Sequence, residues 1–434
     1  MNKRLVRPTL VWLIILVILP LPLLWLLNAG LTDSFHNLLI YDLGLLAYTY
    51  WLTIVYLSTR PKWLERWLGL PKMYLVHGLL GVCALALALL HSQLSFSMQR
   101  WVVLTGWLAL YLAIGGVFYA AFFLSGWLVD YSPRAAKLKK RLQRPFNHRA
   151  SLWLHRLNFV VIALIWFHVH LIPRLYQLTG FIIFFDCYTL VAVAAYCWQH
   201  FVATDLAKNK GRVIGNRPLS PRVQEVTVKL SSQASPYQAG AVYFLSFRGR
   251  GIPAEWNPFS VASASQAAQA APPEVKLVID RVGDFTKRIG QVPPGCPVVL
   301  QGPLGRFEQE IEATAPQTPL VLIAMGVGIA PLRSLVQRYV GKHPITLLWS
   351  VHVPTERYFE GEFKDLAKRE ATFAYHSQVG RLTKERLATL LTESERVRAK
   401  VIVVGSAQGV LAIEGALLGL GFKKRQFIDE RLTI

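Results

Sequence analysis

Long apolar runs dominate the first half of the chain, whereas the second half alternates shorter apolar and polar stretches. Each long run is near the ~20 apolar residues that a helix needs to cross the core of a bilayer. We therefore predict membrane-spanning helices at about residues 9–27, 36–58, 73–92, 101–127, 152–172 and 177–201.

The pattern changes after Lys208 to short alternating strands separated by turn residues, such as 222–230 and 241–247. Such strands are typical of an antiparallel barrel. Residues 320–336 then have the pattern of a strand, a glycine turn and a helix, and later strands alternate with helical stretches, which predicts a parallel sheet. We expect three domains: a transmembrane domain over 1–205, a β-barrel domain over 206–315 and an α/β domain over 316–434.

The composition supports a membrane half followed by a soluble half. Of the 434 residues, 53% are hydrophobic and only 17% are charged, yet the net charge is +22. Soluble proteins average about 25% charged residues. This composition excludes a disordered chain and a disulfide-rich secreted scaffold. The cysteines show no metal or redox spacing, and we expect small buried side chains at the three that lie in apolar stretches, Cys83, Cys187 and Cys197.

Basic residues gather in alternate loops of the first half. The N-terminus, the second loop and the fourth loop carry most of them, whereas the loops on the other side carry only Arg100 and Arg174. The positive-inside rule therefore places both termini, and the soluble half, in the cytoplasm below a cell membrane. The basic run over residues 134–149 could bind nucleic acid. We interpret it instead as a topology signal that touches anionic lipid headgroups, and we expect the bilayer, not nucleic acid, as partner.

Histidines occur at matched levels of the third and fifth predicted spans. His77 and His91 are fourteen residues apart, and His155 and His168 are thirteen apart. The two levels are roughly 20 Å apart at the helical rise. Two imidazoles that face each other at one level can hold a haem iron axially. The pattern therefore predicts two stacked haems, although hydrogen-bonded interfacial histidines are the simpler alternative.

The angle between residues around a helix does not settle which histidine of the fifth span is the outer haem ligand. Thirteen residues turn His168 about 140° away from His155, whereas His170 would lie only about 60° away. This span could be distorted locally, the helices could cross so that opposite flanks are used, or His170 could be the outer ligand. Rotation alone favours His170.

The histidine pattern and the motifs of the soluble half together resemble the NADPH oxidase and ferric reductase superfamily, and small bacterial NADPH oxidases in particular. The resemblance implies a six-helix transmembrane bundle that binds two b haems. A ferredoxin reductase-like module would follow, composed of an antiparallel β-barrel flavin domain and an α/β nucleotide-binding domain. It favours the ligand pairs His77 with His155 and His91 with His168, and it implies FAD and either NADPH or NADH as cofactors.

The segment WNPFSVAS, residues 256–263, resembles the first flavin motif of that superfamily. The resemblance implies that Phe259 packs against the flavin and that the hydroxyl of Ser260, a catalytic position, hydrogen-bonds near the reactive flavin nitrogen. The motif begins here with Asn257 and Pro258, so the usual cationic contact to the flavin phosphates is missing.

The segment GDFT resembles the second flavin motif, in which a helix N-terminus and a hydroxyl meet the pyrophosphate, here at Gly283 and Thr286. Farther along, Gly326-x-Gly328-x-x-Pro331 resembles the nicotinamide-dinucleotide motif of this reductase class. Glycines of this kind let the backbone approach a pyrophosphate.

Three positions depart from the superfamily at its nicotinamide end. Val404-Gly405-Ser406 stands where Cys-Gly-Pro is frequent, with Gly405 kept as a cofactor-binding position. Leu432 replaces the terminal aromatic residue that covers the flavin, and His352 replaces an arginine for the 2′-phosphate of NADP. The choice between NADH and NADPH therefore stays open.

The expected function is electron transfer from cytoplasmic NAD(P)H through FAD and two haems to an acceptor outside the cytoplasm. Oxygen, giving superoxide, is favoured over a ferric complex because the chain most resembles bacterial NADPH oxidases. A ferric or metal-chelate reductase of the same architecture is the alternative. A haem-binding sensor or transport module without turnover is a hypothesis of a different class.

Overall fold

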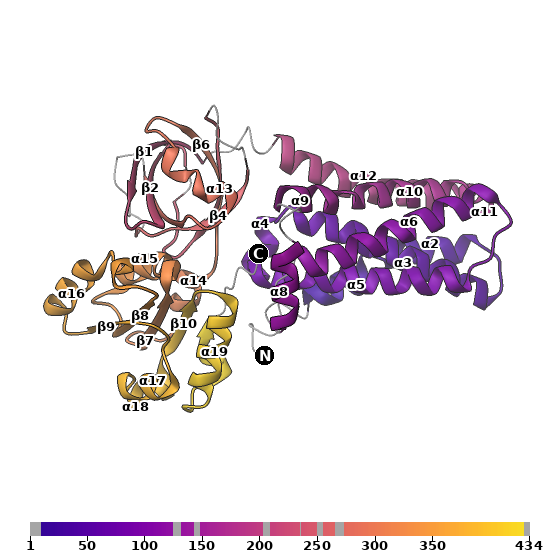
Figure 1. Ribbon diagram of the computed structural model, residues 1–434. Helices are drawn as coiled ribbons and strands as arrows, with labels where there is room; N and C mark the ends of the chain where they lie inside the picture. Colours follow the sequence, from indigo (N-terminus) through magenta and orange to yellow (C-terminus); the bar gives the residue numbers. More distant parts are fainter. Residues whose placement is uncertain are drawn as a thin grey trace. The chain divides into compact units, whose positions relative to one another are not determined.

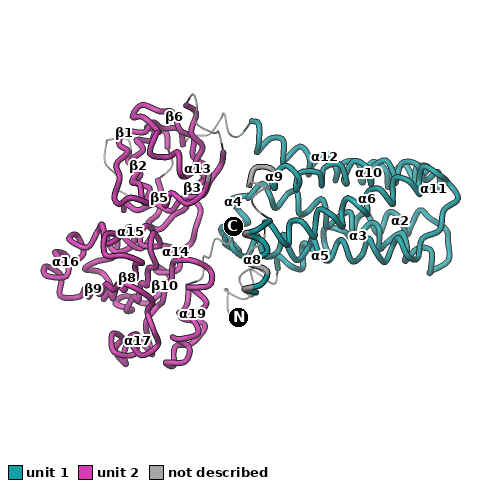
Figure 2. The backbone as a smooth tube through the Cα atoms, viewed as in Figure 1, with its two compact units in different colours: residues 1–203, 432–434 teal, residues 204–431 magenta. Residues whose placement is uncertain are grey.

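The computed structural model describes residues 10–124, 132–142, 148–202, 209–234, 236–249, 255–264 and 273–428. The chain divides into two compact units that meet in sequence between Ala203 and Thr204 (Figure 2). The basic N-terminal residues and the terminal Leu432, on which two of the sequence predictions rest, lie outside the described residues.

The first unit is a bundle of long apolar helices (Figure 1). Its α-helices are α2 (Leu21–Gly30), α3 (Phe35–Ser58), α4 (Lys62–Leu68), α5 (Leu70–Leu94), α6 (Arg100–Tyr119), α8 (Pro133–Leu142), α9 (His148–Arg156), α10 (Asn158–His170), α11 (Pro173–Tyr176) and α12 (Thr179–Cys197). Single π-helical turns extend three of the long helices, at Ile14–Ile18, Ala120–Leu124 and Trp198–Val202.

Six helical segments are long and apolar enough to cross a membrane, by length and composition. They are Leu10–Gly30, Phe35–Ser58, Leu70–Leu94, Arg100–Leu124, Ser151–His170 and Thr179–Val202. Each overlaps one of the six predicted spans, because apolar length was the signal that the sequence carried. The outward side of the bundle is apolar, with Trp25, Phe118 and Leu190 each about two-thirds exposed. Such a continuous apolar surface suits lipid rather than water.

The expectation that Cys83, Cys187 and Cys197 are buried is wrong. All three side chains are exposed on the bundle. A membrane span is apolar on the face toward lipid as well as on the face toward its neighbours, so an apolar sequence context does not indicate burial within the protein.

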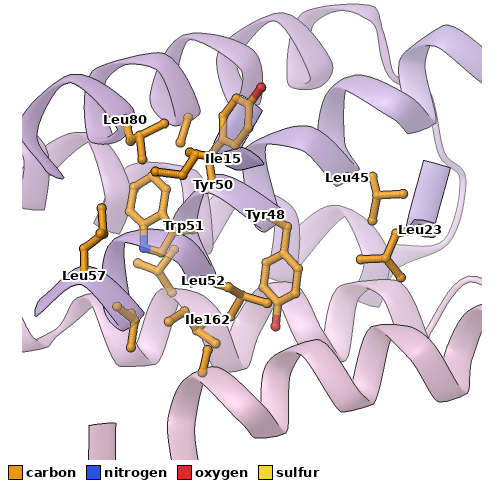
Figure 3. Close-up of a cluster of buried hydrophobic side chains, with 14 of the residues drawn as sticks. Ile15, Leu23, Leu45, Tyr48, Tyr50, Trp51, Leu52, Leu57, Leu80 and Ile162 are labelled. Carbon is orange, nitrogen blue, oxygen red and sulfur yellow. The ribbon is translucent and has the colours of Figure 1, made fainter. Parts of the chain in front are cut away.

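The interior of the bundle is centred on α3, whose second half is almost continuously buried (Figure 3). The ring of Tyr48 stacks on Phe185 of α12 with ring centroids 4.8 Å apart. Its hydroxyl shares a hydrogen bond of 2.9 Å with the hydroxyl of Thr189. A buried tyrosine hydroxyl needs a partner, so this contact fixes the register of α3 against α12.

The second unit begins with a six-stranded antiparallel sheet in the order β4-β3-β6-β1-β2-β5. Its strands are β1 (Lys210–Pro218), β2 (Val223–Leu230), β3 (Val242–Phe247), β4 (Asn257–Ser260), β5 (Glu274–Asp280) and β6 (Pro297–Leu304). The short helix α13 (Asp284–Lys287) follows β5, and α14 (Phe307–Glu312) follows β6. The two edge strands approach each other, since Val261, next to β4, forms a single bridge with Leu277 of β5.

The rest of the second unit is a five-stranded parallel sheet in the order β11-β10-β7-β8-β9. Its strands are β7 (Leu320–Met325), β8 (Ile345–Val351), β9 (Phe373–Val379), β10 (Lys400–Val404) and β11 (Phe427–Ile428). Its helices are α15 (Ile329–Tyr339), α16 (Glu360–Arg369), α17 (Lys384–Leu390), α18 (Glu393–Arg398) and α19 (Ala407–Leu418).

The two sheets of the second unit share one apolar core. Val223, Ala239 and Ala262 from the antiparallel part belong to the same buried cluster as Leu332 and Leu335 of α15. Helix α15 therefore packs against both parts and fixes one relative to the other.

Candidate functional site

Two pairs of histidines face each other inside the helical bundle. The ring centroids of His77 and His155 are 6.0 Å apart, and those of His91 and His168 are 6.4 Å apart. A metal–imidazole bond is about 2 Å long, as in zinc sites. Two imidazoles on opposite sides of one metal ion would therefore have ring centroids about 6 Å apart. Both pairs have the spacing that an ion held by two imidazoles requires.

Each pair supplies only two imidazole ligands, which fits a metal whose other ligands come from a prosthetic group. Among the residues that the structure describes, no group of three or more His, Cys, Asp or Glu side chains is placed to hold a bare metal ion. A haem iron needs only axial ligands from the protein, because the porphyrin supplies the remaining ones. The residues present therefore fit two haem groups better than two bare ions.

Backbone carbonyls orient three of the four imidazoles. The Nδ1 atom of His91 lies 2.8 Å from the carbonyl oxygen of Ile40, and that of His168 lies 2.9 Å from the carbonyl oxygen of Val102. His77 makes a hydrogen bond with the backbone of Ile54. A carbonyl only accepts, so Nδ1 of His91 and of His168 must carry the proton, and their Nε2 atoms keep a lone pair that can bind a metal.

His155 is the exception within the set. Its Nδ1 atom is buried and has no hydrogen-bond partner among the described residues. Its own backbone carbonyl accepts a hydrogen bond from the Asn158 side chain at 2.6 Å.

Two glycines allow the outer imidazoles to approach their carbonyl partners. Gly44 stands four residues after Ile40, and a Cβ atom there would lie 2.9 Å from the His91 ring. Gly106 stands four residues after Val102, and its Cβ atom would lie 3.2 Å from the His168 ring. The same arrangement thus occurs twice, once on α3 and once on α6. The sequence analysis missed both glycines, although each lies inside an apolar span, where close helix contacts favour small residues.

The structure places His168, and not His170, opposite His91. Span five is interrupted at Leu157, between α9 and α10, so the rotation expected for one unbroken helix does not apply. His170 lies elsewhere: its Nε2 atom is 3.3 Å from Oδ1 of Asp186, and its ring stacks on Trp166 at 4.1 Å. The structure thus contains the local distortion of the fifth span that the sequence analysis gave as one of three explanations.

The two segments that resemble flavin motifs meet in the second unit. Phe259 of β4 and Phe285 of α13 stack with their centroids 6.4 Å apart, and Phe285 also stacks on Phe247. On the same face of β3 and β4, two buried polar atoms have no partner among the described residues: Asn257 Nδ2 and Tyr243 Oη. Buried polar groups are normally hydrogen-bonded. A polar cofactor with an aromatic ring system fits this combination of ring faces and unpaired donors. Pro258 and Ser260 are half-buried on the same strand.

The second flavin segment differs from the expected helix N-terminus. Helix α13 has only four residues, so its aligned backbone dipoles are few. The hydroxyl of Thr286 accepts a hydrogen bond of 2.9 Å from the backbone N–H of Gly283. The Thr286 hydroxyl thus accepts from the Gly283 N–H group that an external anion would otherwise bind.

Residues Gly326–Gly328, which we call the glycine loop, follow β7 at the point where the strand order of the parallel sheet reverses. The chain runs from β7 to β8 and β9 on one side, then returns to β10 on the other. Ligands of open α/β sheets bind at the carboxyl ends of the strands beside such a switch point. Gly326 has a φ of 57° there, and its carbonyl accepts a hydrogen bond from the Trp349 indole at 2.9 Å.

A close backbone contact explains Gly328, and a close side-chain contact explains Gly405. A Cβ atom at Gly328 would lie 2.3 Å from the carbonyl oxygen of Val404, and one at Gly405 would lie 2.7 Å from Met325. Pro331 is buried in the first turn of α15. Met325, which the sequence analysis missed, thus covers the carboxyl end of β10 with its flexible thioether chain.

Residues that follow β8 carry groups that can donate hydrogen bonds to a nucleotide. His352 is exposed, and its backbone N–H donates to the carboxylate of Glu356 at 3.0 Å. The Nε atom of Arg357 and the hydroxyl of Tyr358 are buried and without partners among the described residues. Burial raises the pKa of Tyr358, so its hydroxyl is a neutral donor at physiological pH.

Comparisons with known proteins bear on the second unit. No protein-family model matches the chain. Flavohemoprotein A of Dictyostelium discoideum is 27% identical over 142 residues, which are 31% of this chain and 35% of that protein. Ferredoxin–NADP reductase B of Sorangium cellulosum is 27% identical over 143 residues, 32% of this chain and 55% of that protein. The chain thus spans about a third and about half of the length of these curated relatives.

A solved structure with a similar fold is the FAD/NAD-binding domain of nitric oxide dioxygenase from Vibrio cholerae. It has a TM-score of 0.43 and 18% identity, and it covers 51% of this chain and 97% of that domain. By its sequence similarity to the flavohemoprotein and the ferredoxin–NADP reductase, part of the chain is ferredoxin reductase-like. We call the second unit, with its antiparallel sheet, parallel sheet and glycine loop, the reductase-like module.

Replacing Gly328 by alanine should destabilise the reductase-like module. The added methyl group would overlap the carbonyl of Val404, and overpacking of this kind costs about 1–3 kcal/mol. Calorimetric unfolding of the full chain should show a lower transition temperature for this variant. Gly361→Ala is the matched control, since nothing lies within 4 Å of its Cβ position. Equal transition temperatures for the two variants would contradict the close contact.

Proposed function

We propose that this chain is a membrane flavocytochrome of the NADPH oxidase and ferric reductase type. It moves electrons from cytoplasmic NAD(P)H through FAD and two b-type haems to an acceptor on the opposite side of the membrane. One observation carries the proposal: two facing histidine pairs lie at two levels of an apolar bundle in a chain that also contains a ferredoxin reductase-like module.

The histidines would hold the haems as axial ligands, His77 with His155 at one level and His91 with His168 at the other. Along the unbroken helix α5 the two levels are about 21 Å apart. When bound, FAD accepts a hydride and releases its electrons singly, and each haem iron carries one electron at a time. The names of the two curated relatives, a flavohemoprotein and an NADP-linked reductase, agree with these cofactors.

The chain's own residues bind and orient these groups. Phe259 and Phe285 offer ring faces to the flavin, and Ser260 offers a hydroxyl at the end of β4. The loop from Gly326 to Gly328 leaves backbone N–H groups free to approach a pyrophosphate. The carbonyls of Ile40 and Val102 keep Nδ1 protonated in His91 and His168, so that their Nε2 atoms would be available to hold the haem iron.

The acceptor is small, and we favour oxygen over a ferric complex. The connections at the His91 end of the bundle are short, at residues 31–34, 95–99 and 171–178. An ion pair of 2.6 Å between Arg174 and Asp33 holds two of them together. With oxygen the balanced reaction is NAD(P)H + 2 O2 → NAD(P)+ + H+ + 2 superoxide, since each oxygen takes one of the two electrons.

The proposed orientation has both termini and the reductase-like module in the cytoplasm, with the chain in the cell membrane. Basic residues support it, since the connections at the other end contain Arg60, Lys62 and Arg66 and the helix α8. Lipid-facing positive charge accumulates on the cytoplasmic side of membrane proteins.

Purified protein should show the function directly. We expect a dithionite-reduced minus oxidised spectrum of b-type haem, and we expect NADH or NADPH to produce the same reduced bands without oxygen. In air, turnover should yield superoxide that superoxide dismutase removes. Reduction of ferric chelate that superoxide dismutase leaves unchanged would assign a ferric acceptor instead. Haems that only dithionite reduces would contradict the proposed electron source and favour a sensor or transport module.

The outer ligand can be tested with two neighbouring histidines. His168→Ala should lower the haem content from two to one per chain, because one axial ligand of the outer pair is removed. His170→Ala should retain both haems, because His170 packs against Trp166 and Asp186. Pyridine haemochrome measurements on both variants decide the point. Loss of a haem only in His170→Ala would assign the ligand role to that residue.

Gly44 provides an independent test of the outer pair. In Gly44→Ala the methyl group would collide with the His91 ring, displacing it from the carbonyl of Ile40. We expect the variant to lose the outer haem or to have altered absorption bands for it. In a redox titration monitored by absorbance, the step that belongs to the outer haem should then have a lower amplitude. Gly115→Ala is the control, since its Cβ position has nothing within 4 Å. Identical titrations of the two variants would contradict this role.

A further inference from the structure

Adjacent residues of α15 hold both chain segments at the open end of the hairpin formed by β3 and β4. Before β3, the backbone N–H of Gly240 donates to the hydroxyl of Ser334 at 2.7 Å. After β4, the carbonyl of Ala262 accepts a hydrogen bond of 2.9 Å from the guanidinium of Arg333. This hairpin carries Phe259 and Ser260 of the first flavin segment. Helix α15 begins directly after the glycine loop of the nucleotide segment.

Arg333 is an unusual residue for such a contact, because it is buried. A buried guanidinium needs ionic and hydrogen-bonding partners. Its Nε atom bonds both carboxylate oxygens of Glu362 on α16, at 3.0 and 2.8 Å. Its charged carbon also lies 4.4 Å from the ring centroid of Phe359, a cation–π contact. These contacts together hold this one side chain in a single position.

Glu362 also holds a second side chain on the same face of α15. Gln337, one helical turn after Arg333, donates to Glu362 at 2.8 Å and accepts from the backbone N–H of Ala264 at 2.9 Å. The carboxylate therefore aligns two side chains, and both bond the short segment 262–264 that follows the flavin strand. We call Arg333, Gln337 and Glu362 the α15 clamp.

We propose that the α15 clamp sets the position of the flavin strand relative to the nicotinamide site, so that Arg333 is a positioning residue for hydride transfer. The inference rests on the proposed function and deepens it. In the balanced step, C4 of the nicotinamide gives a hydride to the flavin, NAD(P)H + FAD + H+ → NAD(P)+ + FADH2. Hydride transfer requires the reacting atoms about 3–3.5 Å apart, and a misplacement of about 1 Å can cost about 10²-fold in rate. A rigid link between the two binding segments controls that distance.

The sequence does not reveal the clamp, because its parts are distant along the chain. Arg333 follows the nucleotide motif directly and looks like an ordinary helix charge, and Glu362 lies in a charged surface helix. Only the fold brings Glu362 to Arg333, and Arg333 to the backbone of Ala262.

The test uses the full-length protein and ferricyanide, an artificial acceptor of flavin electrons. Arg333→Gln should lower kcat at least tenfold, with little change in the KM for the nucleotide and with unchanged FAD content. The primary isotope effect with nucleotide deuterated at the transferred position should rise, because hydride transfer becomes more rate-limiting. Arg333→Lys should recover part of the rate, since it restores the charge opposite Glu362 but not the guanidinium fork.

Arg217→Gln is the matched control. It removes an arginine–glutamate pair of the same 2.8 Å length, formed between β1 and β2 and away from the hairpin ends. It should leave both kcat and the isotope effect unchanged. Wild-type kcat and isotope effect in Arg333→Gln would overturn the proposal.

A second variant covers the case in which Arg333→Gln fails to fold or loses FAD. Gln337→Ala removes the contacts to Ala264 and Glu362 but leaves the ion pair between Arg333 and Glu362 in place, so we expect a smaller fall in kcat with the same rise in the isotope effect. An unchanged isotope effect in a folded, FAD-containing Gln337→Ala protein would overturn the proposal. Failure of the proposed function looks different, because the wild-type protein itself would then reduce no acceptor with either nucleotide.

Discussion

The orientation of imidazole rings inside an apolar bundle is the constraint on which the rest of this protein depends. A histidine within a membrane span is costly unless its polar atoms are satisfied. The outer rings solve this problem at Nδ1, whose N–H donates a hydrogen bond to the carbonyl of Ile40 or Val102, and Gly44 and Gly106 leave the space that these contacts need. The same hydrogen bonds leave the lone pair of Nε2 unused in each ring, and under the proposed function this atom would bind a haem iron. Helix packing and glycine placement are thus coupled to the orientation of the rings.

A comparable coupling operates in the reductase-like module, although the means are different. The glycine loop and the flavin strand lie on separate sheets, and α15 joins them through its buried polar residues and its apolar face. Buried charged contacts contribute little net stability but give a specific geometry. In an enzyme that must align two ring systems, geometry is the property that such contacts can supply.

Much of the architecture could be predicted from the sequence because it follows from strong physical requirements. The bilayer demands about 20 apolar residues per span, and the six spans follow from that pattern. His77 and His91 share one unbroken helix, so their spacing carries over directly into two levels. Gly326 has a positive φ, Gly328 meets the carbonyl of Val404 and Gly405 meets the side chain of Met325, so each of these three positions favours glycine.

Other features depend on contacts that local patterns do not contain. The interruption at Leu157 has no proline or glycine to mark it. The side chain of Asn158 donates a hydrogen bond to the carbonyl of His155. Because asparagine side chains compete in this way with helix hydrogen bonds, Asn158 was the one signal of the interruption in the sequence. The short α13, the exposed cysteines and the α15 clamp likewise depend on tertiary packing. Rotation along an ideal helix therefore favoured His170 over His168.

The most direct test of the central claim is electron paramagnetic resonance of the oxidised, purified protein at low temperature. Axial ligation by two imidazoles at both levels predicts two low-spin ferric signals of equal intensity per chain. A high-spin signal, a single low-spin signal or no haem signal at all would contradict the pairing of imidazoles as axial ligands.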